Sequence, residues 1–293
     1  MSINVSMFFG FHDSGVAFSS DAKILLCLQA ERIFRKKHMR ATSNQLEYLV
    51  AIGLKELNLS INEIDTLFIG RWGCEPTSFI HLLGRRFAPV WTAHHANHIG
   101  WAKSVGWESG FAVCADGGSE NGCSGIYKFN SGGYEPIADL DSTILTGKYY
   151  GAITQLLFDV DPESAHVHLP GKTMGIAAFG SFDPILAKHI LTQVDGGAIH
   201  TERISKIADF LQFKSSFDSR DRRRWNFAHT AQAIWETQWL ETLAQFCPAG
   251  EKLIFSGGCA LNVQLNARLR HSGLFADLFI PPTPGMTVRR WEL

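Results

Sequence analysis

Residues 110–140, GFAVCADGGSENGCSGIYKFNSGGYEPIADL, are the stretch of sequence that decides the expected fold. Three runs of strand-forming residues, at 111–116, 124–129 and 134–140, are separated by glycine-rich turns. The same pattern opens the chain over residues 5–28, and an acidic residue closes the first strand of each copy, Asp13 and Asp116. Alternating helices and strands follow each copy. We therefore expect two α/β lobes related by duplication, residues 1–108 and 109–293, rather than one domain with two unrelated hairpins.

Hydrophobic periodicity predicts the remaining elements. Helices are expected at residues 45–57 (with an N-cap supplied by Thr42-Ser43-Asn44), 93–103, 149–158, 227–246 and 260–270. Strands are expected at 65–70, 252–255 and 276–280, and a glycine-punctuated loop joins the helix ending at 158 to the one beginning at 227.

Composition narrows the classes of partner. The chain has 293 residues and a formal net charge of −1, which gives no electrostatic reason to expect duplex nucleic acid or an anionic membrane as a partner. The opening MSINVSMFFG lacks the basic segment of a signal peptide, and no apolar run approaches the roughly 20 residues that span a bilayer. The six cysteines form no C-x-x-C pair, so we expect reduced thiols and a cytoplasmic location.

The sequence HHANH at residues 94–98 is the sharpest chemical feature. His94 and His98 are four residues apart, so on a helix they share one face and can hold one metal ion. Asp116, at the end of a buried strand, is the best candidate for a third ligand. Histidine and carboxylate ligands suit iron, manganese or zinc, and the ligand types do not choose among them. The alternative is a structural histidine pair.

Three glycine-rich segments predict an anion or nucleotide site. Each is expected to be a turn at the end of a strand or before a helix, with tight structural turns as the alternative. None matches the P-loop or the G-x-G-x-x-G pattern. The segments are DGGSE at 116–120 (Gly117, Gly118, Glu120), GKTMG at 171–175 (Lys172, Gly175) and SGGCALN at 256–262 (Gly257, Gly258, Asn262).

Two further residues are candidates for catalysis. His12 precedes Asp13 at the end of the first strand, where an imidazole beside a carboxylate can act as a general base or can be a hydrogen-bonded turn residue. Lys37 lies in the basic run 32–40, which is either a solvated face or a contact for an anionic ligand.

These blocks resemble the N-terminal catalytic domain of the O-carbamoyltransferases of nodulation-factor and antibiotic biosynthesis. The resemblance implies a two-lobed actin/Hsp70-like fold with ribonuclease-H-like lobes, which tRNA threonylcarbamoyl-transfer proteins share. It implies a divalent metal, iron by resemblance, at His94, His98 and Asp116. It also implies that the glycine segments hold an ATP-derived carbamoyl-adenylate and that His12 serves the acceptor. The matching blocks are GFHDS (10–14), ERIFRKKH (31–38), HHANH (94–98), DGGSE (116–120), GKTMGIAAFG (171–180) and SGGCALNVQLN (256–266).

The C-terminus departs from the family pattern. A D-x-G-x-A-x-G-A segment is expected after the proline-rich turn at 281–285, but Met286–Leu293 stands there, and the family's activating domain does not follow. Back-translation of these eight residues, read one base earlier, can give Asp-Asp-Gly-Ala-Ala-Leu-Gly-Ala. This favours a frameshift and a truncated second lobe over a divergent natural ending. Because the activating domain does not follow, a missing or separate domain is the expected source of carbamoyl-adenylate.

We therefore expect a carbamoyltransferase that acts on the hydroxyl or amine of a small-molecule acceptor. The alternatives are a tRNA threonylcarbamoyl-transfer-like protein, an actin-like phosphotransferase, or a non-catalytic remnant that binds metal or nucleotide. Phosphotransfer usually relies on carboxylate-bound Mg²⁺ rather than a histidine pair, which disfavours the second of these alternatives.

Overall fold

The structure is a computed structural model that describes residues 2–10, 12–20, 23–70, 75–101, 105–118, 122, 124–141, 144–213 and 217–282. Glu120 and the unusual ending Met286–Leu293 lie outside the described residues. The chain divides into two compact units, one centred on residues 1–108 and the other formed by 109–118 and 122–280.

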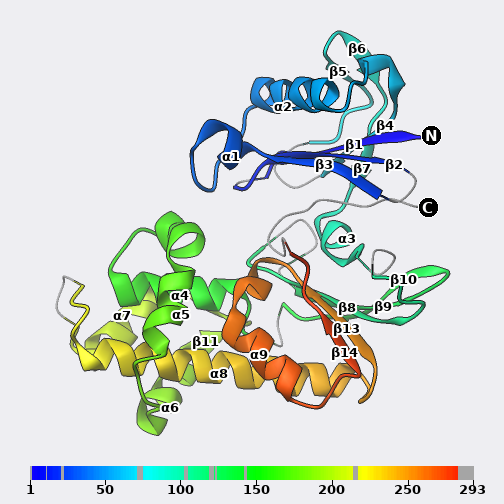
Figure 1. Ribbon diagram of the computed structural model, residues 1–293. Coiled ribbons are helices and arrows are strands. Elements are labelled where there is room, and N and C mark those ends of the chain that lie inside the picture. Colours follow the sequence, from blue (N-terminus) through cyan, green and yellow to red (C-terminus); the bar gives the residue numbers. More distant parts are fainter. Residues whose placement is uncertain are drawn as a thin grey trace. The chain divides into compact units, whose positions relative to one another are not determined.

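The first unit is built on a five-stranded sheet in the order β3-β2-β1-β4-β7. Strand β1 is antiparallel to β2, which is antiparallel to β3, whereas β1, β4 and β7 are parallel. Helix α2 lies over this sheet (Figure 1). The elements are β1 (Ile3–Phe8), β2 (Gly15–Ser20), β3 (Lys23–Gln29), α1 (Ala30–Phe34), α2 (Ser43–Glu56), a 3-10 helix (Ile61–Glu63), β4 (Ile64–Gly70), β5 (Ile80–Leu82), β6 (Arg85–Phe87), β7 (Val90–Thr92) and α3 (His94–Ile99).

The second unit has a five-stranded sheet in the order β10-β9-β8-β13-β14. Its longest helix, α8, runs beside α4 and α5 (Figure 1). The elements are β8 (Gly110–Ala115), β9 (Ser124–Asn130), β10 (Gly133–Asp139), α4 (Gly147–Phe158), a π-helix (Ser164–His168), α5 (Pro170–Ala177), α6 (Pro184–Thr192), β11 (Val194–Asp195), β12 (Ala198–Ile199), α7 (Thr201–Leu211), α8 (Arg222–Phe246), β13 (Lys252–Ser256), a 3-10 helix (Gly258–Leu261), α9 (Val263–His271) and β14 (Asp277–Phe279).

The two sheets have the same topology. In the second unit β8, β9 and β10 are joined antiparallel in chain order, and β8, β13 and β14 are parallel, as in the first unit. The duplicated α/β architecture expected from the strand–turn pattern is therefore confirmed. Parallel neighbours β8 and β13 end at the same edge of their sheet, which brings the residues after each strand together.

The prediction of a loop between residues 158 and 227 is wrong. Helices α5, α6 and α7 and the β11–β12 hairpin fill much of this segment, and α8 begins earlier, at Arg222. The glycines of GKTMG lie inside α5, where Thr173 and Ala177 are buried one helical turn apart. Packing of that face against α4 and α8 outweighs the cost of about 1 kcal/mol for each glycine in a helix.

Two other predicted helices have different bounds. Helix α3 spans six residues, His94–Ile99, whereas a helix over residues 93–103 was predicted. Residue 103 lies outside the described residues. The segment predicted as a helix at 260–270 consists of a 3-10 helix followed by α9.

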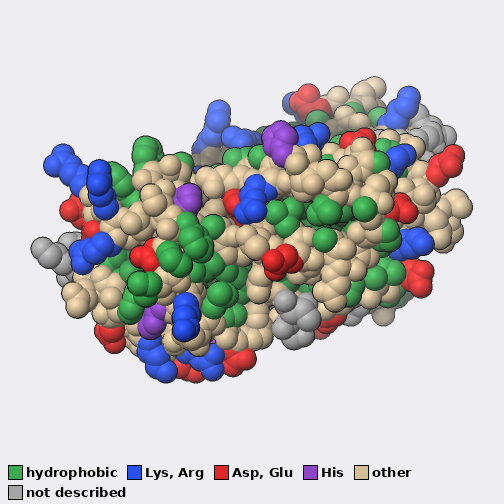
Figure 2. Space-filling model, turned by 90° about the horizontal axis from the view of Figure 1, so that it is seen from below, with side chains coloured by type: hydrophobic (Ala, Val, Ile, Leu, Met, Phe, Trp, Pro, Cys, Tyr) green, Lys and Arg blue, Asp and Glu red, His purple; other side chains and the backbone are tan. Residues whose placement is uncertain are grey.

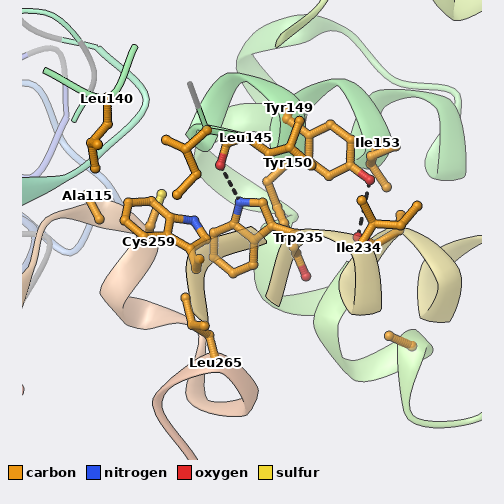
Figure 3. Packing of buried hydrophobic residues seen from close by; sticks show 14 of the residues in the cluster. Ala115, Leu140, Leu145, Tyr149, Tyr150, Ile153, Ile234, Trp235, Cys259 and Leu265 are labelled. Carbon is orange, nitrogen blue, oxygen red and sulfur yellow. Dashed lines mark hydrogen bonds between the residues drawn. The ribbon is translucent and has the colours of Figure 1, made fainter. Parts of the chain in front are cut away.

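Aromatic residues of α8 and α4 form much of the core of the second unit. Trp235 lies against Tyr150, and its indole N–H donates a hydrogen bond to the carbonyl oxygen of Leu145, 2.8 Å away (Figure 3). Tyr149 is fully buried and donates through its hydroxyl to the carbonyl of Ala231 at 3.2 Å. These contacts hold α8 against α4 and the segment that leads into it.

We expect Trp235→Ala to lower the free energy of unfolding by about 3–5 kcal/mol, because it leaves a large cavity in a close-packed core. Trp235→Phe keeps most of the ring volume but removes the bond to Leu145, so a smaller loss of about 1–3 kcal/mol is expected. Urea unfolding followed by circular dichroism measures both values. Equal losses in the two variants would contradict this division between packing and hydrogen bonding.

Basic, acidic and apolar side chains are interspersed over the face seen from below (Figure 2). This distribution agrees with the formal net charge of −1. Among the helices that the structure describes, none combines the length and the apolar composition that crossing a membrane requires.

Candidate functional site

Helix α3 presents two imidazoles on one face. It begins at His94, directly after the short strand β7, and both His94 and His98 are buried. Their Nε2 atoms are 3.1 Å apart, and the rings meet at 73° with centroids separated by 4.6 Å. The expected i,i+4 juxtaposition of the two side chains is therefore present.

The histidine pair fits a transition metal. Two nitrogens bound at about 2.1 Å to one ion are roughly 3.0–3.4 Å apart when the angle between the bonds is about 90–109°. The observed Nε2 separation of 3.1 Å lies within this range. His95 is also buried, but its ring centroid is 6.4 Å from that of His94, so it does not share the paired arrangement.

The end of strand β4 makes room for α3. Gly70 closes β4, and a Cβ atom there would lie 3.0 Å from the Phe8 ring and 3.3 Å from the Asn97 amide. The Phe8 ring in turn lies 6.3 Å from that of His94. The absence of a side chain at Gly70 therefore lets the histidine helix approach the sheet.

Asp116 is held at the end of β8 in the second unit. Its backbone N–H donates to Ser124 Oγ at 3.2 Å, and its Oδ1 accepts from the N–H of Gly117 at 2.7 Å. The hydrogen bond from Gly117 thus orients the Asp116 carboxylate at the start of the turn. This position suits a ligand oxygen at a strand end.

The first and third glycine segments meet in the second unit. Gly257 follows β13 with φ at +99°, and a Cβ atom there would clash with the backbone of Ala115. A Cβ atom on Gly258 would lie 3.1 Å from Asp116 Oδ1. The edge where β8 and β13 end therefore places the backbone of Gly257 and Gly258 beside Asp116.

Sequence reasoning missed Gly147, the first residue of α4. Its N–H donates to the carbonyl of Asp116 at 3.1 Å, and a Cβ atom on it would lie only 2.8 Å from Gly117 Cα. Thr146 caps the helix by accepting from the N–H of Lys148. A threonine–glycine pair before a helix was the available signal, but it does not reveal the contact with Gly117.

The second glycine segment is not a turn, which corrects that expectation. Lys172 and Gly175 lie on the exposed side of α5, and a Cβ atom on Gly175 would meet open space. The helix is nevertheless tied to the third segment, because Gln264 in the first turn of α9 donates to the carbonyl of Met174 at 3.0 Å.

Asn262 has a structural position. Its Oδ1 caps α9 by accepting from the N–H of Leu265, and its amide exchanges two hydrogen bonds of 3.0 Å with the buried Gln232. These bonds use the side chain within the fold. We expect Asn262 to shape the third segment rather than to contact a ligand through its amide.

The glycines of the two converging turns provide a matched pair of variants. We expect Gly257→Ala to cost about 2 kcal/mol or more of folding stability, since it combines a left-handed backbone with a backbone clash. Gly118→Ala should be nearly neutral because a Cβ atom there has no neighbour within 4 Å. Thermal melting of both variants tests this expectation, and similar melting temperatures would contradict it.

The other predicted catalytic residues lie in the first unit. The Nδ1 atom of His12 lies 2.8 Å from Asp13 Oδ2, and both side chains are partly exposed. Lys37 is exposed in the turn that follows α1. The pairing of an imidazole with a carboxylate is the arrangement that orients a general base.

Comparisons with known proteins cover nearly the whole chain. The family model described as the carbamoyltransferase N-terminus matches residues 3–98 and 86–287. Nodulation protein U of Azorhizobium caulinodans is 24% identical over 93% of this chain and 58% of its own length. An uncharacterized protein of Methanocaldococcus jannaschii is 24% identical over 94% of this chain and 53% of its own length. The chain thus spans a little over half the length of these relatives.

Solved structures share the fold at low sequence identity. Component A of (R)-2-hydroxyglutaryl-CoA dehydratase from Acidaminococcus fermentans is 9% identical, with a TM-score of 0.58, over 97% of this chain and 93% of its own. The activator of 2-hydroxyisocaproyl-CoA dehydratase from Clostridium difficile is 9% identical, with a TM-score of 0.57, over 97% and 90% of the two chains. With the duplicated sheet topology, these similarities confirm the actin/Hsp70-like fold expected from the sequence.

Proposed function

The chain belongs to the carbamoyltransferase family, in the part described as its N-terminus, and we propose that it transfers a carbamoyl group from carbamoyl-adenylate to an acceptor hydroxyl or amine. The family match over nearly the whole chain is the observation that carries this proposal. The paired histidines, the converging glycine segments and the His12–Asp13 contact support it, because each supplies a group that the reaction needs.

His12 is the proposed general base. The acceptor oxygen or nitrogen attacks the carbamoyl carbon and forms the new bond, while the bond from that carbon to the phosphate oxygen breaks and AMP leaves with the electron pair. The acceptor proton goes to His12 Nε2. The contact of Nδ1 with Asp13 supports this role, since it leaves the other ring nitrogen as the basic one.

His94 and His98 are the proposed ligands of a divalent transition metal, with Asp116 as a third ligand and iron as the expected ion. A metal bound there would supply Lewis acidity for polarising the carbamoyl oxygen. Burial of the two imidazoles and their 3.1 Å separation support the assignment.

Backbone groups of Gly117, Gly118, Gly257 and Gly258 are proposed to contact the adenylate. The support is their convergence at one sheet edge of the second unit, because backbone without side chains can approach a phosphate closely. We also assign Lys37 and Lys172 to balancing the phosphate charge, with Gly175 beside Lys172. A contact from Glu120 stays a prediction because this residue lies outside the described part of the chain.

A separate activating domain is the proposed source of carbamoyl-adenylate, and a small molecule in the cytoplasm is the proposed acceptor. The matched region covers 58% and 53% of the lengths of the two relatives, so each has further sequence outside it.

The proposal is tested by supplying the donor directly. The metal-loaded chain is mixed with synthetic carbamoyl-adenylate and hydroxylamine, a small nucleophile whose carbamoylation yields hydroxyurea and AMP. We expect both products to form together and faster than in buffer, measured by mass spectrometry. A folded, metal-loaded chain that gives no acceleration would overturn the proposal. Phosphorylation of an added acceptor by ATP would instead support the phosphotransferase alternative.

A further inference from the structure

We propose that Asp13 is a positioning residue whose single carboxylate holds both predicted catalytic residues of the first unit, His12 directly and Lys37 through His38. This inference rests on the proposed function for the roles of His12 and Lys37, and it deepens that function by explaining why the GFHDS and ERIFRKKH segments occur together.

The carboxylate of Asp13 bridges two imidazoles. Its Oδ2 lies 2.8 Å from Nδ1 of His12, and its Oδ1 lies 3.1 Å from Nδ1 of His38. A carboxylate only accepts hydrogen bonds when ionised, so each Nδ1 must carry the proton. In the neutral ring this makes Nε2 the basic nitrogen, which is the atom that general-base catalysis by His12 requires.

Asp13 is ionised in this environment at neutral pH. Burial acts to raise its pKa, but the hydrogen bonds and positive charge of His12, followed by those of His38, outweigh burial and hold the pKa below the ordinary value of 3.8. An anionic acceptor strengthens both contacts, because hydrogen bonds to ionised groups are stronger than neutral ones.

His38 is also fixed through its backbone. Its N–H donates to Glu31 Oε2 at 3.0 Å, and Glu31 belongs to α1. Since Lys37 is the preceding residue, these two anchors at His38 restrict where the Lys37 backbone can lie. The lysine side chain itself is exposed and remains able to reach an anion.

Ser14 joins the two segments. Its backbone N–H donates to the carbonyl of Met39 at 3.0 Å, and its buried hydroxyl accepts from the N–H of Ala41 at 2.9 Å while donating to the carbonyl of Phe9 at 3.0 Å. The strand end that carries His12 is therefore attached to the segment that follows His38 independently of the Asp13 bridge.

The backbone conformations of Asp13 and His38 also support the bridge. Asp13 has φ at +54° and His38 has φ at +52°, both in the left-handed region that costs a non-glycine residue roughly 1–2 kcal/mol. Such conformations persist where surrounding contacts determine them, and they concentrate at functional sites. Here both strained residues belong to the same bridge.

The first measurement needs no variant. In the ¹⁵N-histidine-labelled chain at pH 8, NMR should show His12 and His38 in the Nδ1–H tautomer, with peaks assigned from His12→Asn and His38→Asn. The Nε2–H tautomer at His12 would overturn the proposal. Because this readout is independent of activity, it separates failure of the bridge from failure of the proposed carbamoyl transfer.

The second measurement uses Asp13→Asn, with Asp65→Asn as the matched control. Asp65 is exposed in the same unit and accepts a hydrogen bond from the N–H of Ile3 at 2.7 Å. We expect Asp13→Asn to favour the Nε2–H tautomer of His12 and to lower kcat by up to about 10⁴-fold, the loss that follows the same change in a serine protease triad. Asp65→Asn should change neither value.

His38→Asn separates the two halves of the bridge. It should raise KM for carbamoyl-adenylate several-fold by releasing Lys37, while the tautomer of His12 stays Nδ1–H. An unchanged KM in this variant would overturn the Lys37 half of the proposal. The side chains of Asp13, Glu31 and His38 could instead bind a metal, since their ligand atoms lie within 4.8 Å of one another. Metal binding by these side chains at pH 8 in a His94→Ala/His98→Ala variant would overturn the whole proposal.

Discussion

Replacement of His12 by asparagine is expected to lower kcat for carbamoyl transfer by about 10²–10⁴-fold, the usual contribution of a general base. Asparagine keeps a polar side chain of similar size but cannot take the acceptor proton at neutral pH. Carbamoyl-adenylate binding should stay close to that of the unchanged chain, because His12 is not among the groups proposed to contact the adenylate.

His81→Asn is the matched control for this change. His81 is an exposed histidine on β5 of the same unit, so its replacement alters the same chemistry at a site without a proposed role. Rates come from hydroxyurea formation, and affinities come from calorimetric titration with AMP. If His12→Asn lost binding and turnover to the same extent, His12 would be a ligand contact and not the base.

The duplicated fold was predictable because its signals are local. Strand residues in 110–140 are interrupted by glycine turns, and the same pattern opens the chain, so three strands of each sheet could be placed in order. Strand β13 (Lys252–Ser256) was also recognisable, because it contains the apolar run Leu253, Ile254 and Phe255.

The helical segment between α4 and α8 could not be predicted in the same way. Gly171 and Gly175 argue for a turn when the sequence is considered alone, and the helix they belong to buries only Thr173 and Ala177. That helix is stabilised by neighbours that become adjacent only in the folded chain, where α5 packs on α8. Tertiary packing overrides local propensity in such a case.

In the candidate site, too, features set by local spacing were predictable, whereas contacts between distant segments were not. The His94/His98 pair was predictable, because helical spacing alone places two residues four apart on one face. The contact between Gly147 and Gly117 and the bridge from Asp13 to His38 join segments that are far apart in the chain. Neither has a periodic signature, so sequence reasoning did not reveal these contacts, and it missed Gly147 altogether.

His98→Ala is expected to abolish binding of the proposed metal, whereas His95→Ala should retain it. His98 contributes one of the two paired Nε2 atoms, and a single remaining imidazole is a poor site for a divalent ion. His95 is the matched control, since it is a buried histidine on the same helix that lies outside the pair. Purified chains are loaded in turn with Fe²⁺, Mn²⁺ and Zn²⁺ and their metal content is measured by elemental analysis.

Thermal melting supplies a second readout that is independent of metal retention during purification. A ligand that binds only the folded chain stabilises it by about 2.7 kcal/mol when present at 100 times its Kd. Added metal should therefore raise the melting temperature of the unchanged chain and of His95→Ala but leave that of His98→Ala unchanged. Asp116→Asn should show an intermediate rise if its carboxylate is the third ligand. A full metal-dependent rise in His98→Ala would place the metal elsewhere and refute the assignment of the histidine pair.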